Sequence, residues 1–171
     1  MIGETELIYR EEQKFALWLR WLVVLSMVWI VPLSIFSLTK TPPEQGPPGI
    51  LPIILLIVAG VFVPIAIAVL FFLLKLETEV RPDGLYLRYF PFHINFKRFT
   101  TDELSEYYAR KYKPIREYGG WGIRCSFRKG NAYNVSGNKG VQLVFKNGKR
   151  LLIGSQKAED LENAIRSIMG K

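Results

Sequence analysis

Two long apolar stretches without charged residues dominate the first half of the chain. They run from Trp21 to Leu38 and from Ile50 to Leu74. A helix needs about 20 apolar residues to cross roughly 30 Å of hydrocarbon, and a charge-free run of this order is the usual sign of a membrane span. The sequence therefore predicts two transmembrane helices, at residues 15–38 and 50–75, joined as a hairpin.

The connector between the two stretches is short and rich in proline. Residues 39–49 contain four prolines and two glycines, and proline cannot continue a helix. A short polar loop of this kind makes two helices run antiparallel, so the connector is predicted to be an external loop. Arg20 is the only charged residue between Phe15 and Leu38. No Asp, Glu, Lys or His lies inside either stretch, which disfavours a proton relay or a transport pathway.

Basic residues flank the outer ends of the predicted hairpin. Arg10 and Lys14 precede the first stretch and Lys75 follows the second, whereas the connector contains only Lys40. Cytoplasmic loops carry the excess of Lys and Arg in membrane proteins. We therefore expect both termini in the cytoplasm, with residues 1–14 as a cytoplasmic N-terminal segment, and a multi-pass location in the plasma (cell) membrane.

The remainder of the chain, residues 76–171, has the pattern of a basic β-rich domain. From Lys75 onward it carries 19 Lys and Arg against 10 Asp and Glu. Apolar and polar residues alternate with a period of two, which is typical of strands. Turn signals at Arg81–Gly84 and Asn147–Gly148 separate the predicted strands. We expect about seven short antiparallel strands in this cytoplasmic domain.

An amphipathic helix is predicted at the C-terminal end. Ser155 or a neighbour is expected to cap it and Gly170 to end it. The predicted fold class is thus a membrane α-hairpin of two transmembrane helices followed by a mainly-β domain with a C-terminal helix. The apolar stripe of this helix, which would lie on the sheet, consists of Ala158, Leu161, Ile165 and Ile168.

Five segments carry a resemblance to a known group of proteins. They are Tyr9–Gln13, Val80–Leu87, Tyr118–Ile123, Tyr133–Gly137 and Val141–Arg150. In this order, around a membrane hairpin, they resemble prokaryotic membrane proteins with a pleckstrin-homology-like (PH-like) domain, which are largely uncharacterised. The resemblance implies two curved sheets with a C-terminal helix that closes one end. It implies no agreed biochemical role, and a fold alone does not decide function.

Reactive side chains are scarce in the sequence. The single cysteine, Cys125, excludes an intramolecular disulfide, and the single histidine, His93, excludes multi-histidine metal sites. Both are expected to be strand residues, with Cys125 partly buried. Asp102, Glu103 and Glu106 follow helical or turn spacing next to a capping box at Thr100–Glu103, and they are interpreted as structural acids. We therefore expect no catalytic residues, no metal and no cofactor, and the chain is predicted not to be an enzyme.

The densest group of basic residues lies in the middle of the predicted domain. Its positive charge suits anionic lipid headgroups or an acidic partner, although a solvated strand face accounts for the same residues. Trp121 is surrounded by three glycines, so it is either presented at a binding surface or packed against the domain. The candidate surface consists of Arg110, Lys111, Lys113, Arg116, Trp121, Arg124, Arg128 and Lys129.

Two functions are compatible with this pattern. The first is a membrane-anchored binding or scaffold protein whose basic PH-like domain engages a partner protein or anionic lipid at the inner membrane surface. The alternative is an accessory or regulatory subunit of a larger membrane transporter or envelope complex. A second copy of the chain is a further candidate partner. Nucleic acid is disfavoured because the basic residues occur without a recognition motif.

Overall fold

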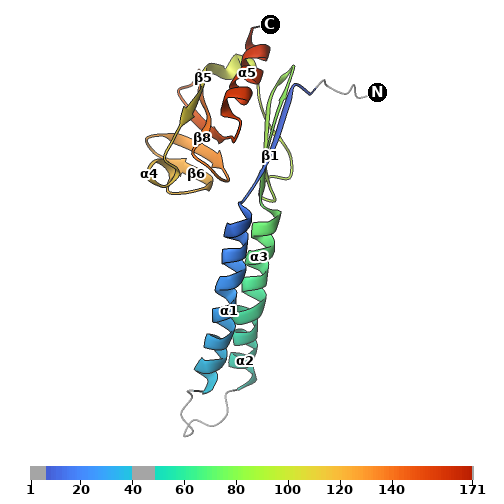
Figure 1. Cartoon of the computed structure of the whole chain (residues 1–171), viewed down its shortest axis with the longest axis vertical. Coiled ribbons are helices and arrows are strands. Elements are labelled where there is room, and N and C mark those ends of the chain that lie inside the picture. Colours follow the sequence, from blue (N-terminus) through green and yellow to red (C-terminus); the bar gives the residue numbers. More distant parts are fainter. Residues whose placement is uncertain (1–6, 40–48, 171) are drawn as a thin grey trace, which may run out of the picture. The chain divides into compact units, whose positions relative to one another are not determined.

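The protein is described by a computed structural model that covers residues 7–39 and 49–170. The chain divides into two compact units, which are described separately. One unit is Phe15–Leu73, and the other joins the N-terminal segment up to Lys14 to the region that begins at Leu74. The first is helical and the second consists mainly of strands (Figure 1).

The helical unit contains one long helix and one interrupted helix. Helix α1 spans Leu17–Thr39. The second apolar stretch forms α2 (Ile50–Ile57), the π-helical turn η2 (Val58–Phe62) and α3 (Val63–Leu73). Helices α1 and α3 pack side by side (Figure 1).

The predicted membrane hairpin is contradicted by the helices of this unit. Within residues 7–39 and 49–170, no helix was found that is both long enough and apolar enough to cross a membrane. This finding corrects the predicted fold class of two transmembrane helices, the expected integral membrane partner and the multi-pass location with both termini cytoplasmic. The second stretch is divided by the π-helical turn. Residues 40–48 of the predicted external loop lie outside the described residues.

The first sheet, sheet A, has four antiparallel strands in the order β1-β2-β3-β4. They are β1 (Tyr9–Lys14), β2 (Lys75–Arg81), β3 (Gly84–Phe90) and β4 (Lys97–Phe99). The turn between β2 and β3 lies where the sequence predicted it. Sequence reasoning missed the pairing of the N-terminal strand β1 with β2, which brings Tyr9 opposite Val80.

The second sheet, sheet B, has five strands in the order β5-β8-β9-β7-β6. Its hairpin at Asn147–Gly148 was predicted, whereas the parallel pairing of β7 with β9 was not. The single turn η3 (Thr101–Glu103) precedes β5, and the short helix α4 (Pro114–Tyr118) follows β5. The five strands are β5 (Leu104–Lys111), β6 (Gly122–Ser126), β7 (Gly130–Asn134), β8 (Lys139–Phe145) and β9 (Arg150–Gly154).

The C-terminal helix α5 (Ala158–Met169) covers one side of the core. It packs on β2, β5 and β8, and its buried side chains include the four of the apolar stripe predicted from the sequence. Lys157, and not Ser155, occupies its N-cap position, without a side-chain cap. Burial of each large apolar side chain stabilises the fold by about 1.5–3 kcal/mol, so this stripe fixes the helix on the sheets.

Strand β1 connects sheet A to the end of sheet B through polar side chains. The amide of Gln13 donates a hydrogen bond of 2.6 Å to the Gly154 carbonyl. The carboxylate of Glu11 accepts hydrogen bonds from the Ser155 hydroxyl (2.6 Å) and the Gln156 backbone N–H (2.8 Å). A hydrogen bond to a charged group contributes about 1.5–3 kcal/mol. The Tyr9–Gln13 segment is therefore a structural part of the mainly-β unit.

Candidate functional site

Four of the eight predicted surface residues line one pocket. Lys113 and Arg116 come from α4 and the residue before it, and Arg128 and Lys129 come from the turn between β6 and β7. Together with Glu117 and Ser126 they enclose a pocket of about 440 Å³. Two segments separated by strand β6 thus present their charges to the same space, which we call the basic pocket.

The local sequence explains how α4 presents its charges. Pro114 begins the helix, where its missing N–H costs nothing. Gly119 ends the helix in the left-handed conformation with φ of 73°, which glycine adopts readily. The sequence predicted only a loop here, because its one proline and three glycines were interpreted as breakers. Pro114 and Gly119 mark instead the two ends of a single short helix, in which Arg116 is exposed.

Glu117, the one acid among the described residues that line the basic pocket, is already ion-paired. The Arg110 guanidinium donates a hydrogen bond of 2.9 Å to Glu117 and also contacts the Tyr118 hydroxyl and Gln142. Arg110, a predicted surface residue, is therefore held by this network and does not line the pocket. Among the described residues, the side chains that line the basic pocket as cations (Lys113, Arg116, Arg128, Lys129) form no ion pair.

The Glu117 carboxyl is held in its charged form. Partial burial raises the pKa of Glu117, but the hydrogen bond from the Lys113 backbone N–H and the Arg110 guanidinium outweigh burial and hold this pKa below its usual range. A carboxyl whose pKa is lower in the folded chain contributes stability above its unfolded pKa. This contribution is lost as the pH falls through the folded pKa.

We expect Glu117→Gln to lower the free energy of unfolding by about 1 kcal/mol at neutral pH. The difference from wild type should shrink as the pH falls below the ordinary carboxyl pKa of 4.5, because Glu117 then becomes protonated in both states. Urea unfolding between neutral and acidic pH measures it. Glu159→Gln is the matched control, since that carboxylate is 79% exposed. A stability difference that does not change with pH would contradict the lowered pKa of Glu117 in the folded chain.

The other predicted surface residues lie outside the basic pocket. Trp121 is 36% exposed, and its indole N–H donates a hydrogen bond of 3.0 Å to the Gly137 carbonyl. Arg124 donates to the Trp121 carbonyl at 2.9 Å, and Lys111 is exposed on β5. The tryptophan is thus anchored by its polar edge, while part of its ring stays accessible. These three residues do not extend the pocket.

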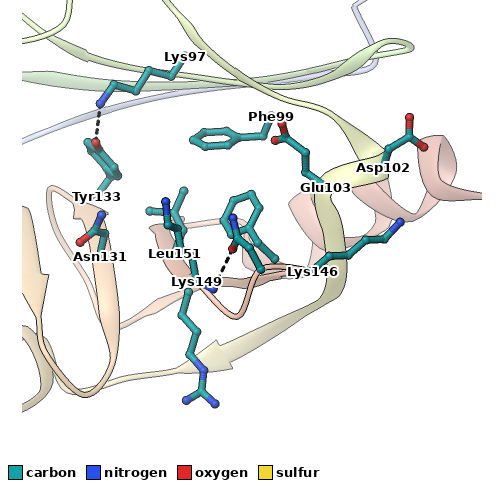
Figure 2. A pocket seen from close by; sticks show the side chains of 12 residues that line it. Lys97, Phe99, Asp102, Glu103, Asn131, Tyr133, Lys146, Lys149 and Leu151 are labelled. Atoms are coloured by element: carbon teal, nitrogen blue, oxygen red, sulfur yellow. Dashed lines mark hydrogen bonds between the residues drawn. The ribbon is translucent and has the colours of Figure 1, made fainter.

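The structure shows a second site that sequence reasoning missed, a groove between the two sheets (Figure 2). Strand β4 and the turn η3 form one wall, and strands β7, β8 and β9 form the other. Its volume is about 440 Å³, within the range of ligand pockets. We call it the inter-sheet groove, and it is lined by Lys97, Phe99, Asp102, Glu103, Asn131, Tyr133, Phe145, Lys146, Asn147, Lys149, Arg150 and Leu151.

The groove has an apolar middle and polar ends. The rings of Phe99 and Phe145 meet in the middle with centroids 5.6 Å apart. At one end the Lys97 ammonium donates a hydrogen bond of 2.9 Å to the Tyr133 hydroxyl (Figure 2). The only local signal for this site was the alternation of Lys97 and Phe99, and nothing in the sequence indicated which strands face them.

Neither His93 nor Cys125 has the environment predicted for it. His93 lies in the irregular connection between β3 and β4, where its ring is 5.7 Å from that of Tyr133. Burial, with a contribution from Lys97, lowers the pKa of His93, so that it is neutral at pH 7. Cys125 lies on strand β6 as predicted but is exposed. Within the described ranges, no group of three or more His, Cys, Asp or Glu side chains could hold a metal ion.

Comparison with known proteins gives a family and no activity. The chain matches, over residues 2–171, the family described as "Family of unknown function (DUF6141)". The chain belongs to this family. The match covers nearly the whole sequence, so the family includes both the helical and the mainly-β unit. No curated protein matches the chain.

Proposed function

We propose that the chain is a binding protein that holds an acidic segment of a partner protein in the basic pocket. One observation carries this proposal. Four cations line a single concavity in which Glu117, the one acid among the described lining residues, is already ion-paired with Arg110. Uncompensated positive charge costs free energy through self-repulsion, and an anionic partner relieves that cost. No part of the proposal involves catalysis.

We also propose that the mainly-β unit is a PH-like domain. The support is its architecture of two sheets with a C-terminal helix that packs against both. Domains of such general architecture serve as binding modules with varied ligands, so the assignment supports binding and does not choose the ligand.

The neighbouring surface favours a macromolecular partner. Phe127, at the tip of the turn that carries Arg128 and Lys129, is fully exposed with a fraction of 109%. Aromatic residues surrounded by polar ones are common energetic centres of protein interfaces. A second depression of about 560 Å³ connects this turn to Lys149 and Arg150. The basic pocket is therefore one part of a larger basic face with an exposed aromatic side chain.

Reversing two charges tests the proposal. We expect Arg116→Glu combined with Arg128→Glu to weaken binding of a fluorescent glutamate-rich peptide by about tenfold or more at low salt, since two unit charges about 4 Å apart in water interact by about 1 kcal/mol. Lys139→Glu combined with Lys157→Glu is the matched control, because both lysines lie outside the pocket. Fluorescence anisotropy at several salt concentrations measures the affinities.

Two results would contradict this function. The first is a peptide affinity that the two variants change equally, which would indicate a general charge effect. The second is binding to phosphatidylglycerol vesicles, but not to the peptide, in a manner that Arg116→Glu with Arg128→Glu abolishes. That outcome would assign the pocket to anionic lipid in place of an acidic protein.

A further inference from the structure

Within residues 7–39 and 49–170, no strand pairs with the edge of sheet A beside the inter-sheet groove. Strand β4 is the last strand of its sheet, and β3 is its one partner in the part of the chain that the structure describes. An edge strand presents unpaired backbone N–H and C=O groups, to which another extended chain can add. Strand β4 has only three residues, which limits unspecific pairing. A free edge next to a groove is the arrangement that an added strand requires.

We propose that the inter-sheet groove binds an extended peptide segment of a partner, which pairs with the free edge of β4 and places alternate side chains in the groove. Lys97 and Phe99 both line the groove, because residues two apart in a strand point to the same side. Side chains of an added strand would follow the same alternation. This site shares no lining residue with the basic pocket, although Lys149 and Arg150 line both the groove and the depression beside that pocket. The inference therefore goes beyond the function proposed above.

The middle of the groove selects an apolar side chain. The Phe99 and Phe145 rings lie at a mutual angle of 49° and are both only partly buried. Leu151 lies with them in the groove lining and is 4% exposed. An aliphatic or aromatic side chain that covers these rings would remove more of their apolar surface from water, at about 25 cal/mol for each Å². The volume of the groove is sufficient for one or two such side chains.

The ends of the groove differ in charge and give the segment a polarity. Lys97 and Tyr133 form one end, and Asp102, Glu103 and Lys146 lie at the other (Figure 2). Neither Asp102 nor Glu103 forms an ion pair with any residue that the structure describes. The two carboxylates outnumber the Lys146 ammonium at their end, so that end is acidic overall. The complementary segment therefore carries an acidic residue near Lys97, an apolar residue in the middle and a basic residue near Asp102 and Glu103.

An unbiased peptide selection tests this inference. A phage library of random heptapeptides is selected on the full chain, and enriched peptides are synthesised. We expect an acidic, an apolar and a basic residue at alternating positions. Asp102→Lys combined with Glu103→Lys should weaken their binding by about tenfold or more, because a favourable charge contact becomes repulsive. Glu106→Lys combined with Glu159→Lys is the matched control with the same change in charge.

Two further measurements distinguish this site from the basic pocket and from a compact ligand site. Amide hydrogen exchange should slow at Lys97–Phe99 when a selected peptide is bound. Arg116→Glu with Arg128→Glu, which tests the basic pocket, should leave the affinity of these peptides within about twofold, because it changes no residue of the groove. The inference is wrong if no peptide is enriched, if Asp102→Lys with Glu103→Lys leaves binding unchanged, or if exchange at β4 does not respond. Binding without a response at β4 would assign the groove to a compact ligand.

Discussion

Replacing Gly130 with alanine is expected to lower the free energy of unfolding by about 4 kcal/mol, through backbone strain and overpacking together. Gly130 opens β7 with φ of +82°, a conformation that L-residues rarely adopt. A Cβ atom here would lie 2.3 Å from the carbonyl oxygen of Arg150 and 2.8 Å from its Cβ. Most of this obstacle is backbone of the paired strand β9, which cannot move aside without breaking sheet B.

Gly137→Ala separates the two contributions. Gly137 has nearly the same φ, +78°, but a Cβ atom there would have no neighbour within 4 Å among the described residues. We expect it to cost only the strain of the left-handed conformation, about 1 kcal/mol. Chemical denaturation of both variants measures the difference. Equal losses of stability would show that strain alone acts at Gly130 and that β7 and β9 can separate without a large cost.

Local signals in the sequence predicted the local parts of the fold. The turn at Arg81–Gly84 and the hairpin at Asn147–Gly148 depend on residues that favour tight turns wherever they occur. The apolar stripe of α5 reflects the helical period and needs no knowledge of its partner strands. These features could be predicted because their causes lie within a few residues of one another.

Pairing between distant segments could not be predicted in the same way. The sequence contains nothing that assigns Tyr9 to Val80, because the pairing depends on what the intervening 70 or so residues do. The parallel contact between β7 and β9 has no local signal either. The second apolar stretch shows a different limit. Its composition indicated one continuous helix, but hydrophobicity does not report the π-helical turn at Val58–Phe62 that divides it.

The candidate site was predictable in composition and not in geometry. A dense basic segment was evident in the sequence, but the pairing of strands decides which of its basic residues line the basic pocket. The turn between β6 and β7 places Arg128 and Lys129 beside α4 in the pocket. Arg110, in contrast, donates hydrogen bonds to Glu117 and Tyr118. The inter-sheet groove was missed because its walls come from β4 and from strands about 30 to 50 residues later, which only the folded chain brings together.

Among the charged groups of sheet A, the buried carboxylate of Glu77 on β2 should affect the free energy of unfolding most when an ion-pair partner is removed. Its side chain is 1% exposed and forms ion pairs with Lys75 (2.7 Å) and Arg88. Arg88 lies opposite it on β3 and stacks on the Phe96 ring at 4.4 Å. Removing one partner of a buried pair leaves the other charge uncompensated, which costs about 3–5 kcal/mol. The effect is asymmetric, because the two cations are partly exposed and can turn toward water, whereas the carboxylate cannot.

We therefore expect Arg88→Leu to lower the free energy of unfolding by about 3 kcal/mol, since Glu77 then keeps only Lys75, and Glu77→Leu by about 2 kcal/mol. The double variant should be more stable than the Arg88→Leu variant, because an apolar pair of similar size replaces the buried charges. Urea denaturation of the wild type, both single variants and the double variant gives the coupling energy of the pair. Additive losses in this cycle would mean that Glu77 and Arg88 are stabilised independently, Glu77 by Lys75 and Arg88 by Phe96.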